Sequence, residues 1–387
     1  MIPQFTSAFA SGINPDVPDF YAPLADGGEG AVDTTLTFGS GSATFTRATE
    51  AATRLSTGLW KLDVASGTAR SHYHEYTAGV MTYGGYLGEA AATQLALLPR
   101  DMTNVAWVAG ATMTVAQDGT GLDGAANSCS RLTAGAVEAT NIVLQTLVVA
   151  AASRTYSAWI KRVTGTGTVA ITQDGSAYTD VTSQLNTTSF VQVQLNATQE
   201  NPVFGIRMTT STDVILVDCN QFENGASGTT PIPAAGSRGA DAFSYDAANV
   251  AAANGTCYAD CSLSVKSSAS NAITFVDGGS AATGILLGIV SSGAVTDATM
   301  DDGPNVLTKS SLTSLLTGVR KRASAWGATT QSITGDGAAV ASGSFDGAMT
   351  ATGVRICTPS TTTGTCAKEV KIWTAKATSP QLVTITT

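Results

Sequence analysis

Residues 155–163 read TYSAWIKRV, and this stretch sets the pattern for most of the chain. Polar and apolar side chains alternate along it, as they do when the two faces of a β-strand meet different surroundings. Short runs of this kind, separated by turn signals, predict antiparallel β-sandwiches or barrels, so the fold class is expected to be all-β. The other runs are TLTFGSGSATFTRAT (35–49), LWKLDV (59–64), TVAITQ (168–173), FVQVQL (190–195), VILVDC (214–219), YADCSLSVK (258–266), AITFV (272–276), GILLGIV (284–290), GVRIC (353–357) and EVKIW (369–373).

Helical patterns are scarce. The spacing of apolar residues in SSLTSLLTGVRKR (310–322) predicts one short helix. The alanine-rich stretch AVEATNIVLQTLVVAAA (136–152) is better explained as sheet, because it is rich in β-branched residues and has strand patterns on both sides. No repeat of about 20–50 residues is present, which argues against a β-helical shaft.

Length and composition limit the function classes. With 387 residues, the chain exceeds what one hydrophobic core normally organises, so two or three domains are expected. The net charge of −9, without a basic stripe, argues against nucleic acid as a partner. The start lacks the charged and apolar regions of a signal peptide, and no apolar run approaches the length of a membrane span. We therefore expect the chain to be made in a cytoplasm and not to insert into a membrane.

The N-terminal 35 residues differ from the rest of the chain. They contain Pro3, Pro15, Pro18 and Pro23 and show no hydrophobic period. Such a segment builds no core of its own, so residues 1–35 are predicted to form an extended arm that docks on another surface. The alternative is a floppy terminus.

Catalytic residues are hard to assemble from this sequence. His72 and His74 are its two histidines, and Glu75 would point away from them on a strand. No G-x-S-x-G elbow is present, and most Asp-Gly pairs read as hairpin turns. We therefore expect no enzymatic activity, although two well-separated acids of a glycoside hydrolase would leave no sequence signal.

Calcium is the one cofactor that the sequence suggests. The loop MDDGPN (300–305) offers the hard oxygen ligands of Asp301, Asp302 and Asn305. Otherwise no cofactor is expected.

The six cysteines include a pair, Cys357 and Cys366, that flanks a TPSTTTGT loop. If two hairpin strands bring them opposite each other, they form a disulfide once outside the cell; the alternative is two half-buried thiols.

Aromatic residues could form a small stacking surface for sugars. Four tyrosines fall within fourteen residues, YHEYTAGVMTYGGY (73–86), and Trp326 lies in a separate strand pattern. The glycan-binding candidates are Tyr73, Tyr76, Tyr83, Tyr86 and Trp326. The alternative is that the tyrosines simply pack one sheet against its neighbour.

A set of motifs in fixed order runs through residues 40–243. The motifs are TRAT (46–49), GYLGEAAATQLAL (85–97), Trp107, TYSAWIK (155–161), QFENGASGTTPIP (221–233) and RGAD (238–241). In order and spacing they resemble a pattern found in fibre, spike and minor structural proteins of tailed-bacteriophage virions. Gln94 and Pro231 depart from that pattern, which prefers Asn and an aromatic residue there. Less specifically, residues 320–343 and 368–386, with Trp326 and Trp373, resemble a concanavalin- or laminin-G-type sandwich.

The resemblance implies tandem β-sandwiches behind the N-terminal arm. We expect the arm at 1–35, a small β module at 36–100, a jelly-roll sandwich like a carbohydrate-binding module at 101–243, and a concanavalin/laminin-G-like sandwich at 244–387.

The function expected from the resemblance is that of a structural virion protein. It would be anchored to other virion proteins of the capsid or tail and would form a homo-oligomer, most often a trimer. The alternative is a receptor-binding protein that recognises host surface polysaccharide, and a depolymerase is a weaker one. Fold alone does not decide between these functions.

Overall fold

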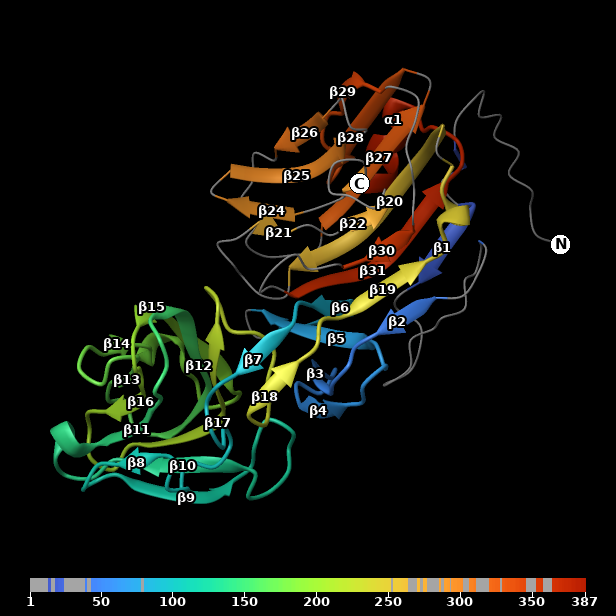
Figure 1. Ribbon diagram of the computed structural model, residues 1–387. Coiled ribbons are helices and arrows are strands. Elements are labelled where there is room, and N and C mark those ends of the chain that lie inside the picture. The colour runs from blue at the N-terminus through green and yellow to red at the C-terminus, as the bar shows by residue number, and fades with distance from the viewer. Residues whose placement is uncertain are drawn as a thin grey trace.

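The computed structural model is built mainly of antiparallel strands, which confirms the all-β prediction (Figure 1). Its helices within the described residues are α1 (Ser379–Thr386) and the 3-10 turns η1 (Glu138–Thr140), η2 (Thr182–Gln184) and η3 (Ala247–Asn249). No helix in this part of the chain is long and apolar enough to cross a membrane. The structure describes residues 13–14, 18–23, 39, 43–77, 80–251, 253–263, 270–271, 274–276, 285–286, 289–292, 294–301, 306–310, 320–327, 329–345, 353–357 and 364–387.

Two sheets face each other in the first sandwich, at the lower left of Figure 1. One sheet has the order β15-β12-β17-β10-β9, with β7 and β18 added beside β17, and the other has the order β14-β13-β16-β11-β8. The strands of the first sheet are β15 (Val191–Gln199), β12 (Ala152–Thr164), β17 (Val214–Asn224), β10 (Cys129–Thr133), β9 (Thr114–Gly119), β7 (Ala92–Gln94) and β18 (Gly236–Arg238). Those of the second are β14 (Thr179–Asp180), β13 (Val169–Thr172), β16 (Val203–Met208), β11 (Ile142–Thr146) and β8 (Val108–Ala109).

Aromatic rings fill the centre of this sandwich. The ring of Phe204 stacks on Phe222 at 4.5 Å between centroids and also contacts Tyr156 and Trp107. All four are almost completely buried. The period of TYSAWIKRV therefore has a direct cause: Tyr156, Ala158 and Ile160 enter this core, whereas Ser157 and Trp159 lie on the opposite face of the sheet, where they are buried as well.

The second group of sheets is formed mainly by the C-terminal half of the chain. An eight-stranded sheet packs against a three-stranded one over a shared apolar core, which includes Tyr86, Phe243 and Trp326. The eight strands are β29 (Ala341–Ser344), β28 (Thr330–Gly335), β27 (Arg320–Gly327), β20 (Asn254–Leu263), β31 (Gly364–Trp373), β6 (Val80–Glu89), β5 (Arg70–Thr77) and β1 (Phe20–Pro23). The three are β2 (Thr44–Thr46), β19 (Ala242–Tyr245) and β30 (Val354–Ile356).

Two further sheets complete the strand pairing. One is the hairpin of β3 (Ala51–Arg54) and β4 (Trp60–Val64). The other contains β21 (Ser270–Asn271), β24 (Ile289–Ser292), β25 (Ala294–Asp301), β23 (Ile285–Leu286), β22 (Thr274–Val276) and β26 (Val306–Ser310).

Strand pairing crosses the domain boundaries expected from the sequence. β6 pairs with β31, so part of the expected module 36–100 lies in the same sheet as the expected C-terminal sandwich 244–387. β2 likewise pairs with β19, which itself spans the expected boundary between 101–243 and 244–387. The reason is that β5 and β6 alone would leave Tyr86 open to water, whereas in the larger sheet Tyr86 is completely buried in the core shared with the three-stranded sheet.

The described part of the N-terminal segment docks on the chain itself. β1 pairs with β31 in antiparallel register, from Phe20 opposite Ile372 to Pro23 opposite Glu369. Ahead of it, Ile13 is buried, and its carbonyl accepts a hydrogen bond from Gln381. An attachment of this segment to other proteins stays a prediction.

Helix α1 was not predicted from the sequence, because SPQLVTIT (379–386) is rich in β-branched residues. Its N-terminus explains the outcome: Thr378 and Gln381 form a capping box, and Pro380 lies in the first turn. Leu382 is then fully buried beside Trp373. The prediction of a helix at 310–322 is wrong for the described residues at both ends, since Ser310 ends strand β26 and Arg320 begins strand β27. Residues 311–319 lie outside the described residues.

The structure holds no disulfide between Cys357 and Cys366, so it corresponds to the alternative of two thiols; a disulfide formed outside the cell stays a prediction. All six cysteines are buried thiols in the structure. Among the described residues, β30 pairs with β19 while β31 pairs with β20 and β6, so these two strands do not pair with each other as a hairpin.

A buried cluster of charged residues links the two groups of sheets; we call it the buried joint. Asp241, ahead of β19, accepts a hydrogen bond from Arg47 at 2.9 Å and another from Arg70. Glu89, at the end of β6, pairs with Arg70 and, at 3.1 Å, with Arg238 of β18. The side chains of all five are at most 1% exposed. Four of these residues belong to TRAT, GYLGE and RGAD, and only Arg70 lies outside the motifs, so three of the motifs behind the resemblance meet at one structural site.

The buried joint fixes the ionisation of Glu89. Burial by itself would raise the pKa of this carboxyl. The charges of Arg238 and Arg70, with hydrogen bonds from Thr230 and Arg70, outweigh that effect and lower the pKa to about 2. Glu89 is therefore ionised throughout the neutral and mildly acidic range.

This lowered pKa predicts an acid-sensitive contribution to stability. Ionised Glu89 stabilises the folded chain fully above its unfolded pKa of about 4.5, and the contribution is lost as the pH falls toward about 2. In urea unfolding between those pH values, the wild type should lose stability more steeply than Glu89→Gln, whose amide binds no proton. Parallel slopes for the two proteins would contradict this account of the joint.

Candidate binding groove

Three of the aromatic candidates for glycan binding are core residues. Tyr73 is 4% exposed, and Tyr86 and Trp326 are fully buried. Trp326 donates from its ring nitrogen to the carbonyl of Ala251, and its ring covers Gly255 so closely that a Cβ there would lie 2.4 Å from it. These three side chains offer no surface for stacking on a sugar, which matches the alternative that the tyrosines pack a sheet against its neighbour.

The two remaining tyrosines give little support for a separate site. Tyr83 is partly buried, and its ring packs edge-on against His74 with 5.3 Å between centroids. The backbone of Tyr76 lies in β5, but its side chain is outside the described residues. Their role in binding stays a prediction.

The calcium hypothesis is not tested by the described residues. Asp301 ends strand β25, whereas Asp302 and Asn305 lie outside the part of the chain that the structure describes. Across the described ranges, no group of three or more His, Cys, Asp or Glu side chains could hold a metal ion.

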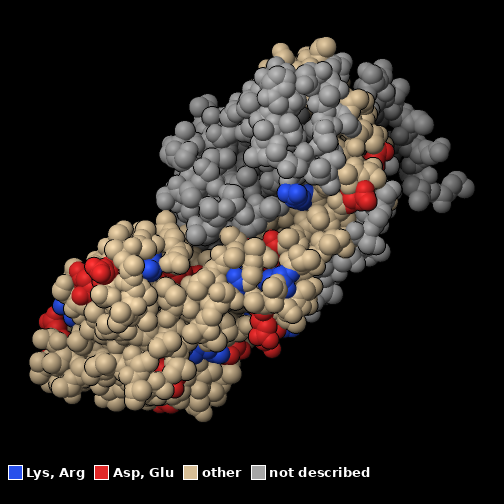
Figure 2. Space-filling view, in the orientation of Figure 1, with Lys and Arg blue, Asp and Glu red and all other residues tan. Residues whose placement is uncertain are grey.

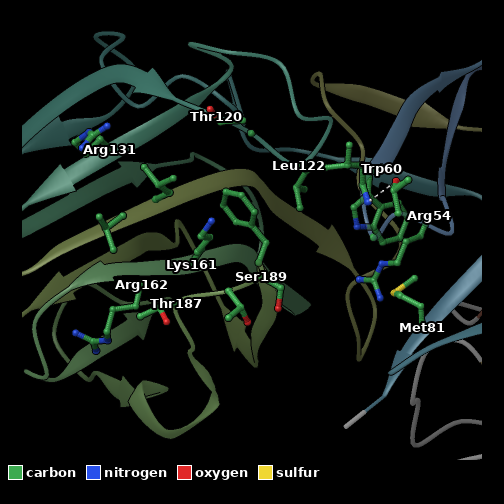
Figure 3. A pocket seen from close by; sticks show the side chains of 18 of the residues that line it. Arg54, Trp60, Met81, Thr120, Leu122, Arg131, Lys161, Arg162, Thr187 and Ser189 are labelled. Carbon is green, nitrogen blue, oxygen red and sulfur yellow. Dashed lines mark hydrogen bonds between the residues drawn. The ribbon is translucent and has the colours of Figure 1, made fainter. Parts of the chain in front are cut away.

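The structure shows a groove that the sequence did not indicate. It has a volume of about 700 Å³ and lies on the outer face of the first sandwich; we call it the binding groove (Figure 3). Its floor comes from alternate residues of TYSAWIKRV: Lys161 and Val163 line it, on the face opposite to the core. Arg131 of β10 and Leu216 of β17 extend the floor across neighbouring strands.

The hairpin β3–β4 forms one wall of the binding groove. The backbone N–H of Trp60 donates to the carbonyl of Leu122 at 2.9 Å, and its ring packs edge-on against Trp159 at 5.1 Å between centroids. The guanidinium of Arg54 lies over both indole rings, 4.7 Å from Trp60 and 5.2 Å from Trp159. The hairpin is thus fixed to the sandwich.

A second wall is held by a buried aspartate. Asp218 of β17 accepts a hydrogen bond from the backbone N–H of Leu122 at 2.8 Å and pairs with Arg100. Burial would lower the pKa of Arg100, but its hydrogen bonds to Asp218 and Asp123 raise it, so the guanidinium keeps its charge. This pairing holds residues 120–122 at the rim of the groove.

The third wall is polar and ends in an aromatic ring. Thr187 and Thr188 are exposed hydroxyl-bearing residues, followed by the half-buried Ser189 and Phe190. Asn186 accepts hydrogen bonds from the backbone N–H groups of Thr188 and Ser189, which fixes this loop ahead of β15. Hydroxyls beside apolar surface suit a sugar ring, which has polar edges and apolar faces.

The charges of the groove lining are unevenly divided. Its basic residues are Arg54, Arg131, Lys161 and Arg162, and its one acidic residue is Asp118. In the view of Figure 3, Lys161 lies between Arg131 and Arg162 on one side and Arg54 with Trp60 on the other. Figure 2 shows that basic and acidic side chains lie in small scattered groups on a described surface that is mostly uncharged.

Part of this lining could have been inferred from the sequence. The outward positions of residues 155–163 follow from the strand period alone. The walls could not be inferred, because the hairpin at 51–64 and the loop at 187–190 reach the floor only through tertiary folding.

No protein-family model matches the chain, and no curated protein matches it. Among solved structures, it is similar to the CBM40 module of the Ruminococcus gnavus IT-sialidase bound to α2,3-sialyllactose, with 14% identity over 35% of this chain and 84% of that one and a TM-score of 0.29. It is also similar to the CBM22-1–GH10 modules of Clostridium thermocellum xylanase 10B, with 12% identity over 37% and 29% of the two chains and a TM-score of 0.25. The tandem CBM22 domains of Paenibacillus barcinonensis Xyn10C give 12% identity over 75% and 99%, with a TM-score of 0.26. Likenesses at these TM-scores say nothing about the ligand of this chain.

Proposed function

We propose that this chain is a non-catalytic, glycan-binding subunit of a tailed-bacteriophage virion. The observation that carries the glycan-binding part is the binding groove, which combines hydroxyl groups, charged groups and apolar surface in a volume suited to a small ligand. The virion part rests on the motifs at 46–49, 85–97, 221–233 and 238–241. In this proposal the N-terminal part anchors the chain to other virion proteins, and three copies of the chain form a trimer. Host surface polysaccharide binds in the groove.

A purely structural virion role is the second candidate. The burial of Tyr73, Tyr86 and Trp326 favours it, because these aromatic residues serve the core rather than a binding surface. Both roles require the chain in the particle. Mass spectrometry of purified virions should detect it, and its absence would contradict both.

Blocking the groove separates the two candidates. Val163 is 38% exposed and lines the groove, so Val163→Trp should fill part of it and weaken binding of host surface polysaccharide at least about tenfold. Val148→Trp is the matched control, since Val148 is 89% exposed and lies outside the lining. Surface plasmon resonance on immobilised polysaccharide measures both. Equal binding by the two variants and the wild type would favour the structural role.

A further inference from the structure

We infer that the binding groove selects acidic saccharides and holds a carboxylate of the sugar between Lys161 and Arg131. This inference rests on the proposed glycan-binding function and deepens it, because it names the chemical class of the ligand.

The charge of the groove differs from that of the chain. The whole sequence has 20 Lys and Arg against 29 Asp and Glu, yet the lining has four basic residues and one acidic residue. Three strands contribute these cations: Arg54 comes from β3, Arg131 from β10, and Lys161 and Arg162 from β12. An excess of one sign in a concave site attracts ligands of the opposite sign.

The four cations are not equally available to a ligand. Arg162 pairs with Asp213 at 3.2 Å and donates to the carbonyl of Gly167, and both charged side chains are nearly buried, so this pair belongs to the fold. Lys161 has no ion pair or side-chain hydrogen bond within the described residues and is partly exposed on the groove floor. Its ammonium group is therefore the main anchor that we assign to an anion.

Arg131 can supply the second contact. Its guanidinium pairs with Asp118 at 2.8 Å, but the two side chains are 39% and 52% exposed. An exposed pair of this kind contributes little to stability and exchanges readily with another anion. Asp118 thus competes with a ligand carboxylate for Arg131, and its removal should strengthen binding of an acidic ligand.

The shape of the site favours a saccharide over nucleic acid. The indoles of Trp60 and Trp159 are 3% and 4% exposed, so they are closed to base stacking. The exposed wall consists of threonine and serine hydroxyls, which suit sugar hydroxyls. The chain charge of −9 also opposes the long phosphate backbone of a nucleic acid.

The test is isothermal titration calorimetry on the full chain with defined ligands. One arm uses an oligogalacturonate and its carboxyl-reduced, neutral form; a second uses an oligosaccharide bearing a pyruvate ketal; a third uses single-stranded oligothymidylate. Binding of either acidic sugar, with the neutral form at least about tenfold weaker, supports the inference, and the acid that binds identifies the source of the carboxylate.

Three variants locate the effect. Lys161→Met should weaken acidic-sugar binding about tenfold. Asp118→Asn should strengthen it several-fold, and a merely structural role of Asp118 would not produce such a gain in affinity. Lys61→Met is the matched control, because Lys61 is an exposed lysine on β4 and lies outside the groove lining. An unchanged affinity in both Lys161→Met and Asp118→Asn would overturn the inference.

The outcomes distinguish the inference from the function beneath it. Equal binding of the acidic and neutral sugars overturns the acid selectivity but keeps glycan binding in the groove. If oligothymidylate binds as tightly as the acidic sugars, the inference of a site for acidic saccharides is overturned, and the groove is a general polyanion site. If Val163→Trp also leaves polysaccharide binding unchanged, the proposed function fails as well.

Discussion

Replacing Asp241 by asparagine should lower the free energy of unfolding by about 3–5 kcal/mol, because the change leaves buried positive charge uncompensated. Asp241 accepts hydrogen bonds from Arg47, Arg70 and the backbone N–H of Glu89, and neither its side chain nor those of the two arginines is exposed. The amide of asparagine would instead present N–H groups to one of two guanidinium groups. Urea unfolding followed by tryptophan fluorescence measures the loss.

The control for Asp241→Asn is the same substitution at an exposed pair. Asp118 is 52% exposed in its pair with Arg131, so Asp118→Asn should change stability by less than about 1 kcal/mol. Equal, small losses in the two variants would mean that water reaches the buried joint.

The second large effect is expected in the core of the first sandwich. Phe204 is fully buried, and its ring contacts Phe222, Tyr156 and Trp107. Phe204→Ala removes these contacts and leaves a cavity, so it should destabilise the sandwich by about 3–5 kcal/mol. Leu98→Ala is the control, since Leu98 is 44% exposed and should lose less than about 1 kcal/mol.

Phe204→Ala also tests whether the groove depends on the sandwich. The floor residues Lys161 and Val163 alternate with Ile160, which lies in the same core as Phe204. In urea at which only the variant is unfolded, its polysaccharide binding should be lost while the wild type still binds. Binding that persists in the unfolded variant would place the ligand elsewhere on the chain.

The strand pattern predicted the sheets, but not their partners. TYSAWIKRV gave a strand and its two faces because both follow from local alternation. The pairing of β6 with β31 joins segments about 280 residues apart, and local sequence carries no signal for such a contact. This is why residues 36–100 were expected to form a module of their own.

Local patterns also misled where a terminus decided the structure. SPQLVTIT resembles a strand in composition, yet the capping box of Thr378 and Gln381 and the proline after Ser379 start a helix there. The sequence left two roles open for the tyrosines of 73–86, a sugar-binding surface or the packing of one sheet against its neighbour. The register of the strands determines which role they take, and it buries Tyr73 and Tyr86 in the core.

The buried joint gives a physical reason for part of the resemblance. Arg47, Glu89 and the pair Arg238 and Asp241 come from three segments that are far apart in sequence, and they meet in one cluster of ion pairs. Each is held by a partner from another segment, so a change at one leaves a buried charge without compensation. These motifs therefore reflect how the two groups of sheets are joined. They do not indicate which ligand is bound, because none of these four residues lines the binding groove.

The most direct test of the central claim is a crystal structure of the chain with an acidic oligosaccharide. We predict that the sugar lies in the binding groove, with its carboxylate within hydrogen-bonding distance of Lys161 and Arg131 and its ring beside Phe190. A sugar bound at another surface, or one whose carboxylate points away from both cations into solvent, would contradict the account.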